Sequence, residues 1–432
     1  MRITFKQAVR LILAGAAAVA IASVVAGAQL VSASAASVGL AGNFTALARN
    51  FNAVNWNPAN LGMPGNSKFS LAILPAQGTL ATGPITPKML KDFDGRLIDS
   101  ATKVLWLNSV ASRGGQSVAE DGGLTFVAGN LGRIGFQLST GVFSSGKLSP
   151  STMEILLFGN AGFTGSPKDY TLSGSTIDAS VITTAAVSIG QSIALKLGPL
   201  PQQTFALGVT GKYIIGNVLL TGIENGGALT SNPVAVRVNF PMVMSDTSSL
   251  NNGAGVGLDV GAAWQVGRLR AGASVKNIVN TFAWDASKFS YRPARAIFTK
   301  DSSTGNWDQQ PLANAPQALR DRITQLNLKP ALAVGAAFSP LGILTITGDL
   351  RQQLGDGLVL GPKTQTGVGA ELRLIPFLPI RAGLAHVTGG TRFGGGVGLE
   401  LGLINIQVAG SHASLDGSEE GGAALTVSLG GH

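Results

Sequence analysis

The segment GVGLDVGAAWQV, residues 255–266, alternates between two kinds of side chain along its whole length. Its even-numbered positions are apolar: Val256, Leu258, Val260, Ala262, Trp264 and Val266. Its odd-numbered positions are small or polar: Gly255, Gly257, Asp259, Gly261, Ala263 and Gln265. A period of two residues predicts a β-strand whose two faces meet different surroundings.

The same pattern recurs in four later segments, each with one apolar face and one small or charged face. These are LRAGASVK (269–276), ILTITGDLR (343–351), GVGAELRL (367–374) and GVGLELGL (396–403). The pattern predicts an all-β fold, a transmembrane antiparallel β-barrel with apolar residues outward and polar residues inward. A soluble β-sheet protein with the opposite orientation alternates in the same way, so periodicity alone leaves both interpretations open.

The composition favours an apolar environment around the protein. Only 12% of the 432 residues are charged, 59 are glycine, and there is no cysteine. The mean hydropathy is positive, at +0.30, which is unusual for a soluble enzyme and excludes a disordered chain. The missing cysteines exclude a lipid-attachment cysteine, a disulfide framework and a thiolate metal site.

The N-terminus has the pattern of an export signal. An uncharged run at 11–28 is preceded by three basic residues, Arg2, Lys6 and Arg10. Small-residue cleavage sites follow at Ala26-Gly27-Ala28 and Ala33-Ser34-Ala35. We predict a signal peptide over residues 1–35, with a mature start near Gln29 or Ala36, and a retained membrane anchor is the alternative.

From residue 254 onward the alternation predicts nine strands joined by connections that are alternately tight and long. The strands are placed at 254–266, 269–277, 328–338, 343–352, 365–374, 379–387, 393–402, 404–412 and 422–430. The long connections are 278–327, 353–364, 388–392 and 413–421. Short turns at one end and longer loops at the other are typical of outer-membrane barrels.

The strands before residue 254 are less regular. Strand-like segments lie at 122–128, 133–143, 170–177, 181–197, 203–221 and 234–245. The alternation of tight and long connections fails through them, which indicates one missed or misplaced strand. The total is about 14 strands, within the range of known outer-membrane barrels.

A segment with a helical pattern precedes the strands, around FTALARNFNAVNWNPANLG, residues 44–62. Its apolar residues recur at spacings of three and four: Leu40, Phe44, Leu47, Phe51 and Val54. This spacing predicts one apolar stripe on a helix, which ends at Asn57-Pro58 because proline cannot continue the hydrogen-bond ladder. Residues 58–62 predict a short helical turn closed by glycine. We therefore expect a small helical hatch over 36–66 inside a barrel formed by 67–432.

These residues also carry a family resemblance. GNFTALARNFNAVNWNPANLG, residues 42–62, resembles the N-terminal signature of the FadL-like (long-chain fatty-acid transporter) outer-membrane barrels, where a helical hatch with an Asn-Pro-Ala motif plugs the barrel. Asn57, Pro58 and Ala59 would be that motif. Residues 255–285 resemble a hairpin of the branch that includes TraF-like conjugal-transfer proteins and PorV-like secretion-associated barrels.

The sequence departs from these patterns at two places. Arg49-Asn50 stands where acidic residues are common in the hatch, which puts any hatch contact made by those acids in doubt. The chain also ends in Leu429-Gly430-Gly431-His432 instead of the terminal aromatic residue that many barrels present to their assembly machinery.

Charged residues on inward strand positions are the candidate lumen residues. They are Asp259, Arg270, Lys276, Asp349, Arg351, Glu371, Arg373, Arg381 and Glu400. Because neighbouring strands carry opposite charges, we expect ion pairs rather than a charge-selective pore.

No pattern in the sequence predicts an enzyme. The three histidines, His386, His412 and His432, are widely spaced, and the glycine-rich segments lie within strands. No nucleophile motif has a partner base at a suggestive spacing, so we predict no catalytic residue, no metal site and no cofactor. The excess of basic over acidic residues is spread along the chain, which predicts no nucleic-acid partner.

Three connecting segments have helical patterns: 87–107, 150–160 and 315–326. The second carries the apolar residues Met153, Ile155, Leu156, Leu157 and Phe158, which form either a lid on the barrel rim or a groove for a hydrophobic ligand.

The resemblance implies an outer-membrane barrel, in contact with membrane lipid, that binds or transports a hydrophobic small molecule such as a lipid or fatty acid. The alternative is a barrel that serves as an attachment or assembly factor for secretion or conjugation proteins. A soluble periplasmic β-protein is a third hypothesis.

Overall fold

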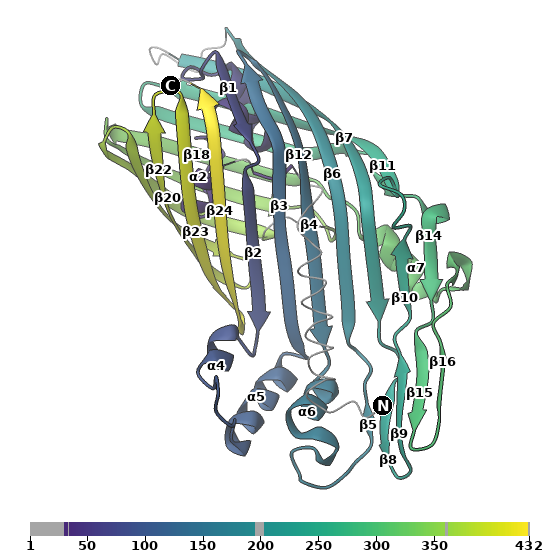
Figure 1. Ribbon diagram of the computed structural model, residues 1–432. Coiled ribbons are helices and arrows are strands. Elements are labelled where there is room, and N and C mark those ends of the chain that lie inside the picture. The colour runs from purple at the N-terminus through teal and green to yellow at the C-terminus, as the bar shows by residue number, and fades with distance from the viewer. Residues whose placement is uncertain (1–29, 33, 195–202, 359–361, 431–432) are drawn as a thin grey trace.

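The computed structural model describes residues 30–32, 34–194, 203–358 and 362–430 and contains a closed antiparallel barrel of fourteen strands (Figure 1). The wall consists of β1 (Phe69–Ile73), β2 (Ala76–Gly83), β3 (Gln116–Leu131), β4 (Ile134–Leu148), β6 (Thr176–Ile193), β7 (Gln203–Ile223), β11 (Gly253–Val266), β12 (Leu269–Asn280), β18 (Ala331–Leu341), β19 (Leu344–Gln353), β20 (Thr364–Ile375), β21 (Leu378–Val387), β22 (Gly390–Leu401), β23 (Ile404–Leu415) and β24 (Ser418–Gly430). β1 and β2 share one wall position, because both pair with β24 on one side and β3 on the other. These pairings close the sheet on itself.

The two faces of the wall differ as the alternation predicts. Large apolar side chains are exposed on the outer face, among them Val187, Val256, Val334, Ile346, Val368, Leu384, Val397, Val408 and Val427. Charged residues such as Asp259, Asp349 and Arg381 are buried inside the barrel. Apolar residues outward and polar residues inward are the arrangement of a barrel that lies in an apolar medium.

The strand that the sequence pattern misses is the one formed by β1 and β2. Its residues are mostly small, with AQGTLATG in β2, and Leu74-Pro75 interrupts it, so no clear apolar face is visible in the sequence. Two predicted strands are not wall strands. Only 176–177 of the segment 170–177 belong to the wall, and 234–245 is divided between a separate small sheet and a short strand that pairs with the end of β7.

Connections at one end of the barrel are tight, as expected. β3–β4, β11–β12, β18–β19, β20–β21 and β22–β23 are each joined by two residues, and β24 ends at this same end. At the other end, two of the predicted long connections, 388–392 and 413–421, are two-residue turns at Thr388-Gly389 and Asp416-Gly417. Gly389 and Gly417 have φ values of +85° and +74°, a conformation that two-residue hairpin turns require and glycine adopts without strain.

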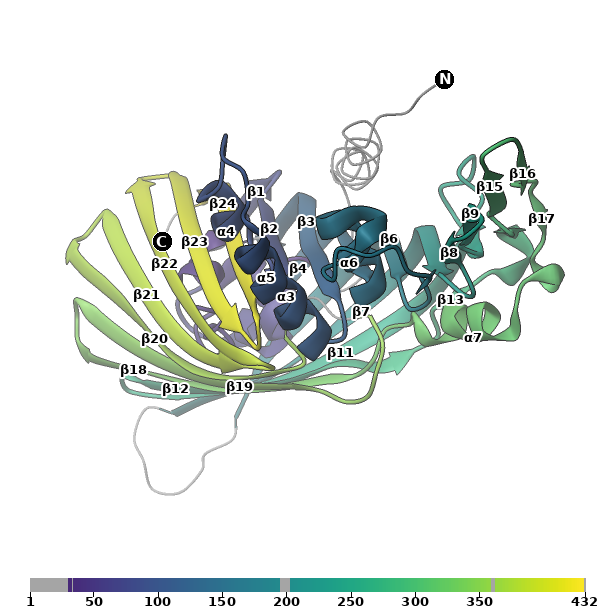
Figure 2. The same cartoon turned by 90° about the horizontal axis from the view of Figure 1, so that it is seen from below.

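The long connections gather at the end opposite the tight turns (Figure 1). They form a five-stranded sheet from β5 (Tyr170–Thr171), β8 (Ala228–Ser231), β9 (Val234–Asn239), β15 (Arg295–Thr299) and β16 (Ser303–Asn306). Figure 2 shows this sheet to one side of the barrel. The shorter elements are β10 (Met242–Ser245), β13 (Ala283–Trp284), β14 (Phe289–Arg292), β17 (Gln310–Pro311) and the 3-10 helices η3 (Gly159–Ala161), η4 (Ala286–Lys288) and η5 (Leu312–Asn314).

Four helices lie in these connections: α4 (Pro87–Lys91), α5 (Ser100–Ser112), α6 (Pro150–Phe158) and α7 (Gln317–Gln325). The last two confirm the helical patterns at 150–160 and 315–326. The helical pattern at 87–107 corresponds to two helices, α4 and the first part of α5, and Gly95, with a φ of +70°, lies between them. Asp99 then starts α5 by accepting a hydrogen bond from the Thr102 backbone N–H. None of the helices described here has the length and apolar character that a membrane crossing would need.

The hatch lies inside the barrel but is not the continuous helix that was predicted from 40 to 54. It contains α2 (Ala35–Gly39), η1 (Asn50–Asn52), α3 (Ala53–Trp56) and η2 (Pro58–Gly62). Left-handed backbone at Ala41, Gly42 and Asn50 breaks the helix. The apolar residues are nevertheless buried, with Phe44 against Trp56 at a ring distance of 5.6 Å. Their spacing therefore indicates burial and not a helix. The short helical turn predicted at 58–62 is confirmed by η2.

Candidate functional site

The Asn-Pro-Ala motif lies where the hatch meets the wall. The side chain of Asn57 is fully buried, and its backbone is extended, which is the conformation favoured for a residue that precedes a proline. Its Oδ1 accepts a hydrogen bond from the Ala59 backbone N–H at 3.1 Å, which starts η2. Its Nδ2 donates to the Ala262 carbonyl on β11 at 3.0 Å. One side chain thus ends the hatch helix and attaches the hatch to the barrel.

Glycines on the inner wall let the hatch backbone come close. A Cβ atom at Gly208 would overlap the Pro58–Ala59 peptide, and one at Gly190 would lie 2.5 Å from the Pro58 carbonyl oxygen. Across the lumen, Gly383 and Gly394 leave room for the backbone of α2 and the turn after it. The glycines pair in register across neighbouring strands: Gly190 with Gly208, Gly208 with Gly261, and Gly383 with Gly394. Inward glycine therefore makes space for the hatch.

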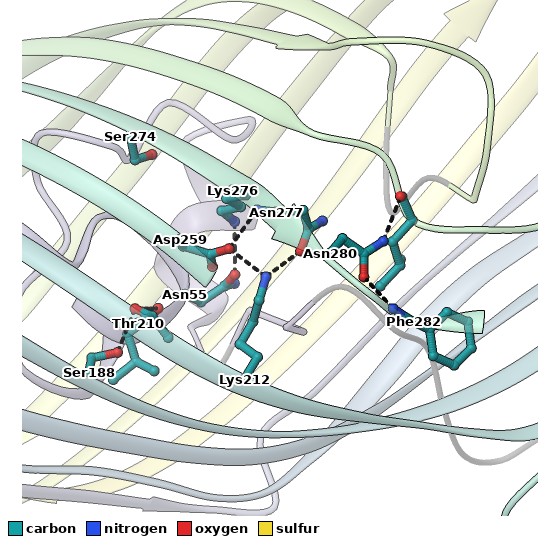
Figure 3. A network of polar contacts seen from close by, with 12 residues as sticks. Asn55, Ser188, Thr210, Lys212, Asp259, Ser274, Lys276, Asn277, Asn280 and Phe282 are labelled. Carbon is teal, nitrogen blue, oxygen red and sulfur yellow. Dashed lines mark hydrogen bonds and ion pairs between the residues drawn. The ribbon is translucent and has the colours of Figure 1, made fainter. Parts of the chain in front are cut away.

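A second set of contacts fastens α3 to β12 (Figure 3). Lys276 Nζ donates to Asn55 Oδ1 at 2.9 Å, and Ser274 Oγ donates to the Trp56 carbonyl at 2.9 Å. The Trp56 ring also receives two cations, Lys276 at 5.6 Å and Arg351 at 5.0 Å from its centroid. Cation–π contacts gain strength when both partners are removed from water.

An ion pair holds an irregularity between β11 and β12 (Figure 3). The Lys212 ammonium lies 2.5 Å from Asp259 Oδ1, and both side chains are 3% exposed. Lys212 also bonds Asn277 Oδ1, and the Asn277 backbone N–H donates to Asp259 Oδ1 at 2.7 Å. The register shifts between Leu258 and Val260, so the Asp259 carboxylate replaces a carbonyl that the regular ladder would supply.

The predicted lumen charges near the tight-turn end form a chain of ion pairs. Glu371 contacts Arg373 and Arg381 at 2.7 Å each, and Arg373 reaches Glu400 at 2.7 Å. Of these pairs, Glu371–Arg381 joins the neighbouring strands β20 and β21 and confirms the expected pairing, whereas Glu371–Arg373 lies within β20 and Arg373–Glu400 joins β20 to β22. Arg270 makes no direct ion pair in the described part of the chain, while Asp349 Oδ1 accepts a hydrogen bond from the Thr45 backbone N–H of the hatch at 3.1 Å.

Sequence reasoning missed five residues that take part in three ion pairs. Lys212 occupies an inward position of β7 and could have been found by the same alternation. Arg392 of β22 pairs with Glu420 of β24 at 2.7 Å. Arg322 on α7 pairs with Asp178 of β6, and the sequence separation of this pair leaves no local signal.

The predicted apolar loop residues lie in a small helical core and not in an open groove. Met153, Leu156, Leu157 and Phe158 of α6 pack against a cluster formed by Ile85, Trp106, Leu107 and Val110. Ile155 is half-buried beside them. A ligand role for the five apolar residues stays a prediction.

Burial and the nearby Glu154 carboxylate of α6 raise the pKa of Tyr170 to about 12.

A cavity of about 390 Å³ lies between the hatch and the long connections. Its apolar lining includes Phe143, Leu326, Leu358, Val387 and Leu415. A smaller cavity of about 120 Å³ shares four lining residues with it and reaches the hatch at Ser37 and Trp56. The three carboxylates on the wall of the larger cavity that come from inward strand positions, Asp121, Asp178 and Glu420, all have partners. Within the described ranges no cluster of residues could hold a metal ion.

Comparison with known proteins agrees with this architecture. The family model described as F plasmid transfer operon, TraF, protein matches residues 54–350. A mutant of the TodX monoaromatic hydrocarbon channel is 12% identical, with a TM-score of 0.52, covering 92% of this chain and 98% of its own. The Ralstonia pickettii toluene transporter TbuX is 15% identical, with a TM-score of 0.49 and coverage of 94% and 100%. A Pseudomonas aeruginosa FadL homologue is 13% identical, with a TM-score of 0.45 and the same coverage. No curated protein sequence matches the chain. The TodX mutant, with a TM-score above 0.5, has the same barrel fold as this chain.

The glycine contacts predict that Gly208→Ala destabilises the barrel by about 1–3 kcal/mol, because its methyl group would overlap the hatch backbone. The matched control is Gly211→Ala on the same strand, where an added Cβ meets no atom within 4 Å. Thermal unfolding and limited proteolysis of the hatch measure the effect. Equal stability of the two variants would contradict a tightly seated hatch.

The buried pair predicts that Asp259→Asn lowers the free energy of unfolding by about 3–5 kcal/mol, because Lys212 keeps its charge without a counter-ion. Replacing both residues, as Lys212→Met with Asp259→Asn, should recover most of that loss. The exposed pair Lys363–Asp356 is the control, and Lys363→Met should change stability by about 1 kcal/mol or less. Urea unfolding followed by tryptophan fluorescence distinguishes these outcomes, and a double variant no better than Asp259→Asn would refute the pairing argument.

Proposed function

This chain belongs to the family described as F plasmid transfer operon, TraF, protein, and we propose that it is a hatch-plugged outer-membrane β-barrel that binds a hydrophobic small molecule in its lumen. The proposal includes transport as the outcome of binding and assigns no covalent chemistry to the chain. Its partners would be membrane lipid and the ligand.

The observation that carries the proposal is the cavity above the hatch. Its volume of about 390 Å³ falls in the range that small-molecule sites occupy. Leu326 at the end of α7, Leu358 after β19 and Phe143 on β4 contribute apolar surface from three separate parts of the chain. Asp178 and Glu420 are neutralised by Arg322 and Arg392, so an uncharged ligand would not meet an unpaired carboxylate from these two.

The apolar outer face supports the membrane location. Strands such as β20 and β22 expose valine and phenylalanine outward along their length, and a soluble protein would pay a high cost in hydrated apolar surface for this. Among the similar solved structures, TodX is a monoaromatic hydrocarbon channel and TbuX is a toluene transporter, which makes a small aromatic compound a reasonable first probe.

An attachment role is the second candidate, and one specific observation favours it. The five-stranded sheet extends beside the barrel mouth and exposes Val234, Ile297 and Phe298. Its outer strand, β16, is fully exposed and pairs with β15 alone among the described strands. An exposed strand edge is suited to pairing with another chain.

The binding proposal predicts that Ala81→Trp weakens ligand binding by about tenfold or more, equivalent to about 1.4 kcal/mol, because the indole would fill the cavity that Ala81 lines. The control is Leu80→Trp, at the adjacent residue, whose side chain lies on the outer face. This variant should bind the ligand as well as the original protein does. Toluene and palmitate are suitable probes for calorimetric titration of the detergent-solubilised barrel. If neither probe binds, and a stoichiometric protein partner co-purifies instead, the attachment role replaces ligand binding.

The membrane location predicts that the loss of stability caused by a charged residue on the outer face depends strongly on its depth in the bilayer. Val368→Arg, halfway along β20 and 57% exposed in the barrel, should lower stability in lipid vesicles by about 2–4 kcal/mol. Leu403→Arg, in the tight turn between β22 and β23, should cost about 0–1 kcal/mol. Similar small effects at both positions would contradict a bilayer around the wall.

A further inference from the structure

The sequence offers two positions for removal of the signal peptide, after Ala28 and after Ala35, and the structure distinguishes them. We propose that cleavage occurs between Ala28 and Gln29, so that residues 30–35 remain as a working part of the hatch. This inference rests on the proposed export of the chain to the outer membrane. It moves the start of the hatch from residue 36, the boundary expected from the sequence, to residue 30 or earlier.

Residues 30 and 31 fill space inside the lumen. Val31 is completely buried and Leu30 is 3% exposed, although both stand near the start of the described chain. Leu30 packs with Val54 of α3 and Ala186 of β6. Val31 fits against Gly123 on β3, where an added Cβ would lie 2.8 Å from Val31 Cγ1. A wall position where any added side chain would collide with this valine indicates that the valine stays in the folded protein.

Hydrogen bonds connect the same segment to both the wall and the hatch. Gln137 Nε2, on β4, donates to the Val31 carbonyl at 2.6 Å. Trp56 Nε1 donates to Ser32 Oγ at 3.2 Å, and Ser32 Oγ lies 2.9 Å from Ser37 Oγ. Removal of residues 30–35 would leave the buried Trp56 N–H without this acceptor, and buried polar groups are rarely left unpaired.

Cleavage after Ala35 would also cut the first turn of α2. The Ser34 carbonyl accepts hydrogen bonds from the Ser37 backbone N–H at 3.3 Å and from Ser37 Oγ at 2.8 Å. The Ala35 N–H donates to Thr426 Oγ1 on β24 at 2.8 Å. Ala36 is 4% exposed, so a new α-ammonium group there would be buried inside the barrel. A buried charge without a partner is strongly unfavourable. Cleavage after Ala28 keeps every one of these contacts.

The position of the cut also shapes the proposed ligand site. Leu30 and Ser32 line the smaller cavity of about 120 Å³, together with Trp56 of the hatch. A protein that begins at Ala36 would lack this part of the cavity floor. Signal removal after Ala28 therefore sets the depth of the lumen above the hatch.

The test is mass spectrometry of the intact protein and of its N-terminal peptide after extraction from outer membranes. We expect a first residue of Gln29, or its cyclised form. Ala26→Leu should reduce processing severalfold, since signal cleavage requires small residues at this position, whereas the matched change Ala33→Leu should leave the N-terminus unchanged. A first residue of Ala36 would overturn the inference while leaving export intact. An unprocessed chain that begins at Met1 in the outer membrane would overturn cleavage and favour a retained anchor, whereas absence of the protein from outer membranes would overturn export.

A second measurement tests the role of the segment in the folded protein. Deleting 29–35, so that Ala28 precedes Ala36, should lower the midpoint of thermal unfolding and speed proteolysis of the hatch. Should the deletion variant fail to insert, the milder Val31→Ala should still lower the midpoint, because it opens a cavity beside Gly123. Unchanged midpoints for both variants would show that the segment is dispensable and would refute the proposal.

Discussion

Closing a sheet of fourteen strands creates an interior that side chains from the wall alone do not fill, and the rest of this structure depends on that constraint. A barrel of about eight strands is just filled by its own side chains, and the diameter grows with strand number. Here the extra space holds the hatch, which begins within the lumen and leads directly into β1. The wall has adapted to this content with glycines where the hatch backbone approaches and with polar groups where the hatch offers carbonyls and amides. The hatch is therefore better described as the core of the barrel than as a separate domain.

The same constraint explains the charges inside the barrel. A charged side chain that faces a plugged lumen has little water around it, so it needs a counter-ion, an aromatic face or several hydrogen bonds. The lumen supplies all three: Asp259 meets Lys212, Arg351 meets the Trp56 ring, and Asp349 meets the Thr45 backbone. These arrangements fix the hatch and the wall relative to each other. They also leave the cavity above the hatch with apolar patches and with two of its carboxylates, Asp178 and Glu420, paired with arginines, which is compatible with the proposed uncharged ligand.

Much of the fold could be predicted from the sequence because a strand between lipid and lumen repeats every two residues. GVGLDVGAAWQV shows both faces and identifies Asp259 as an inward residue. β2 has no detectable alternation because its alanine, glycine and threonine residues are compatible with either the lipid-facing or the lumen-facing side of a strand. The hatch was predicted as a helix because spacings of three and four also arise when a folded-back loop buries its apolar residues. The left-handed backbone at Ala41 has no signal in the residue type, whereas Gly42 and Asn50 are residue types that adopt this conformation readily. Partners such as Arg322 and Asp178 could not be found, since their meeting depends on how a long connection folds over the barrel.

The glycines of the inner wall link the evolution of two parts of the chain that are far apart in sequence. Gly208 and Gly383 can gain a side chain only if the backbone near Pro58 or Leu40 withdraws at the same time, because neither contact is made by a flexible group. Hatch and wall are thus expected to diverge together, and a chimera that combines the hatch of one relative with the barrel of another should assemble poorly. The plugged interior is therefore expected to be inherited as a unit.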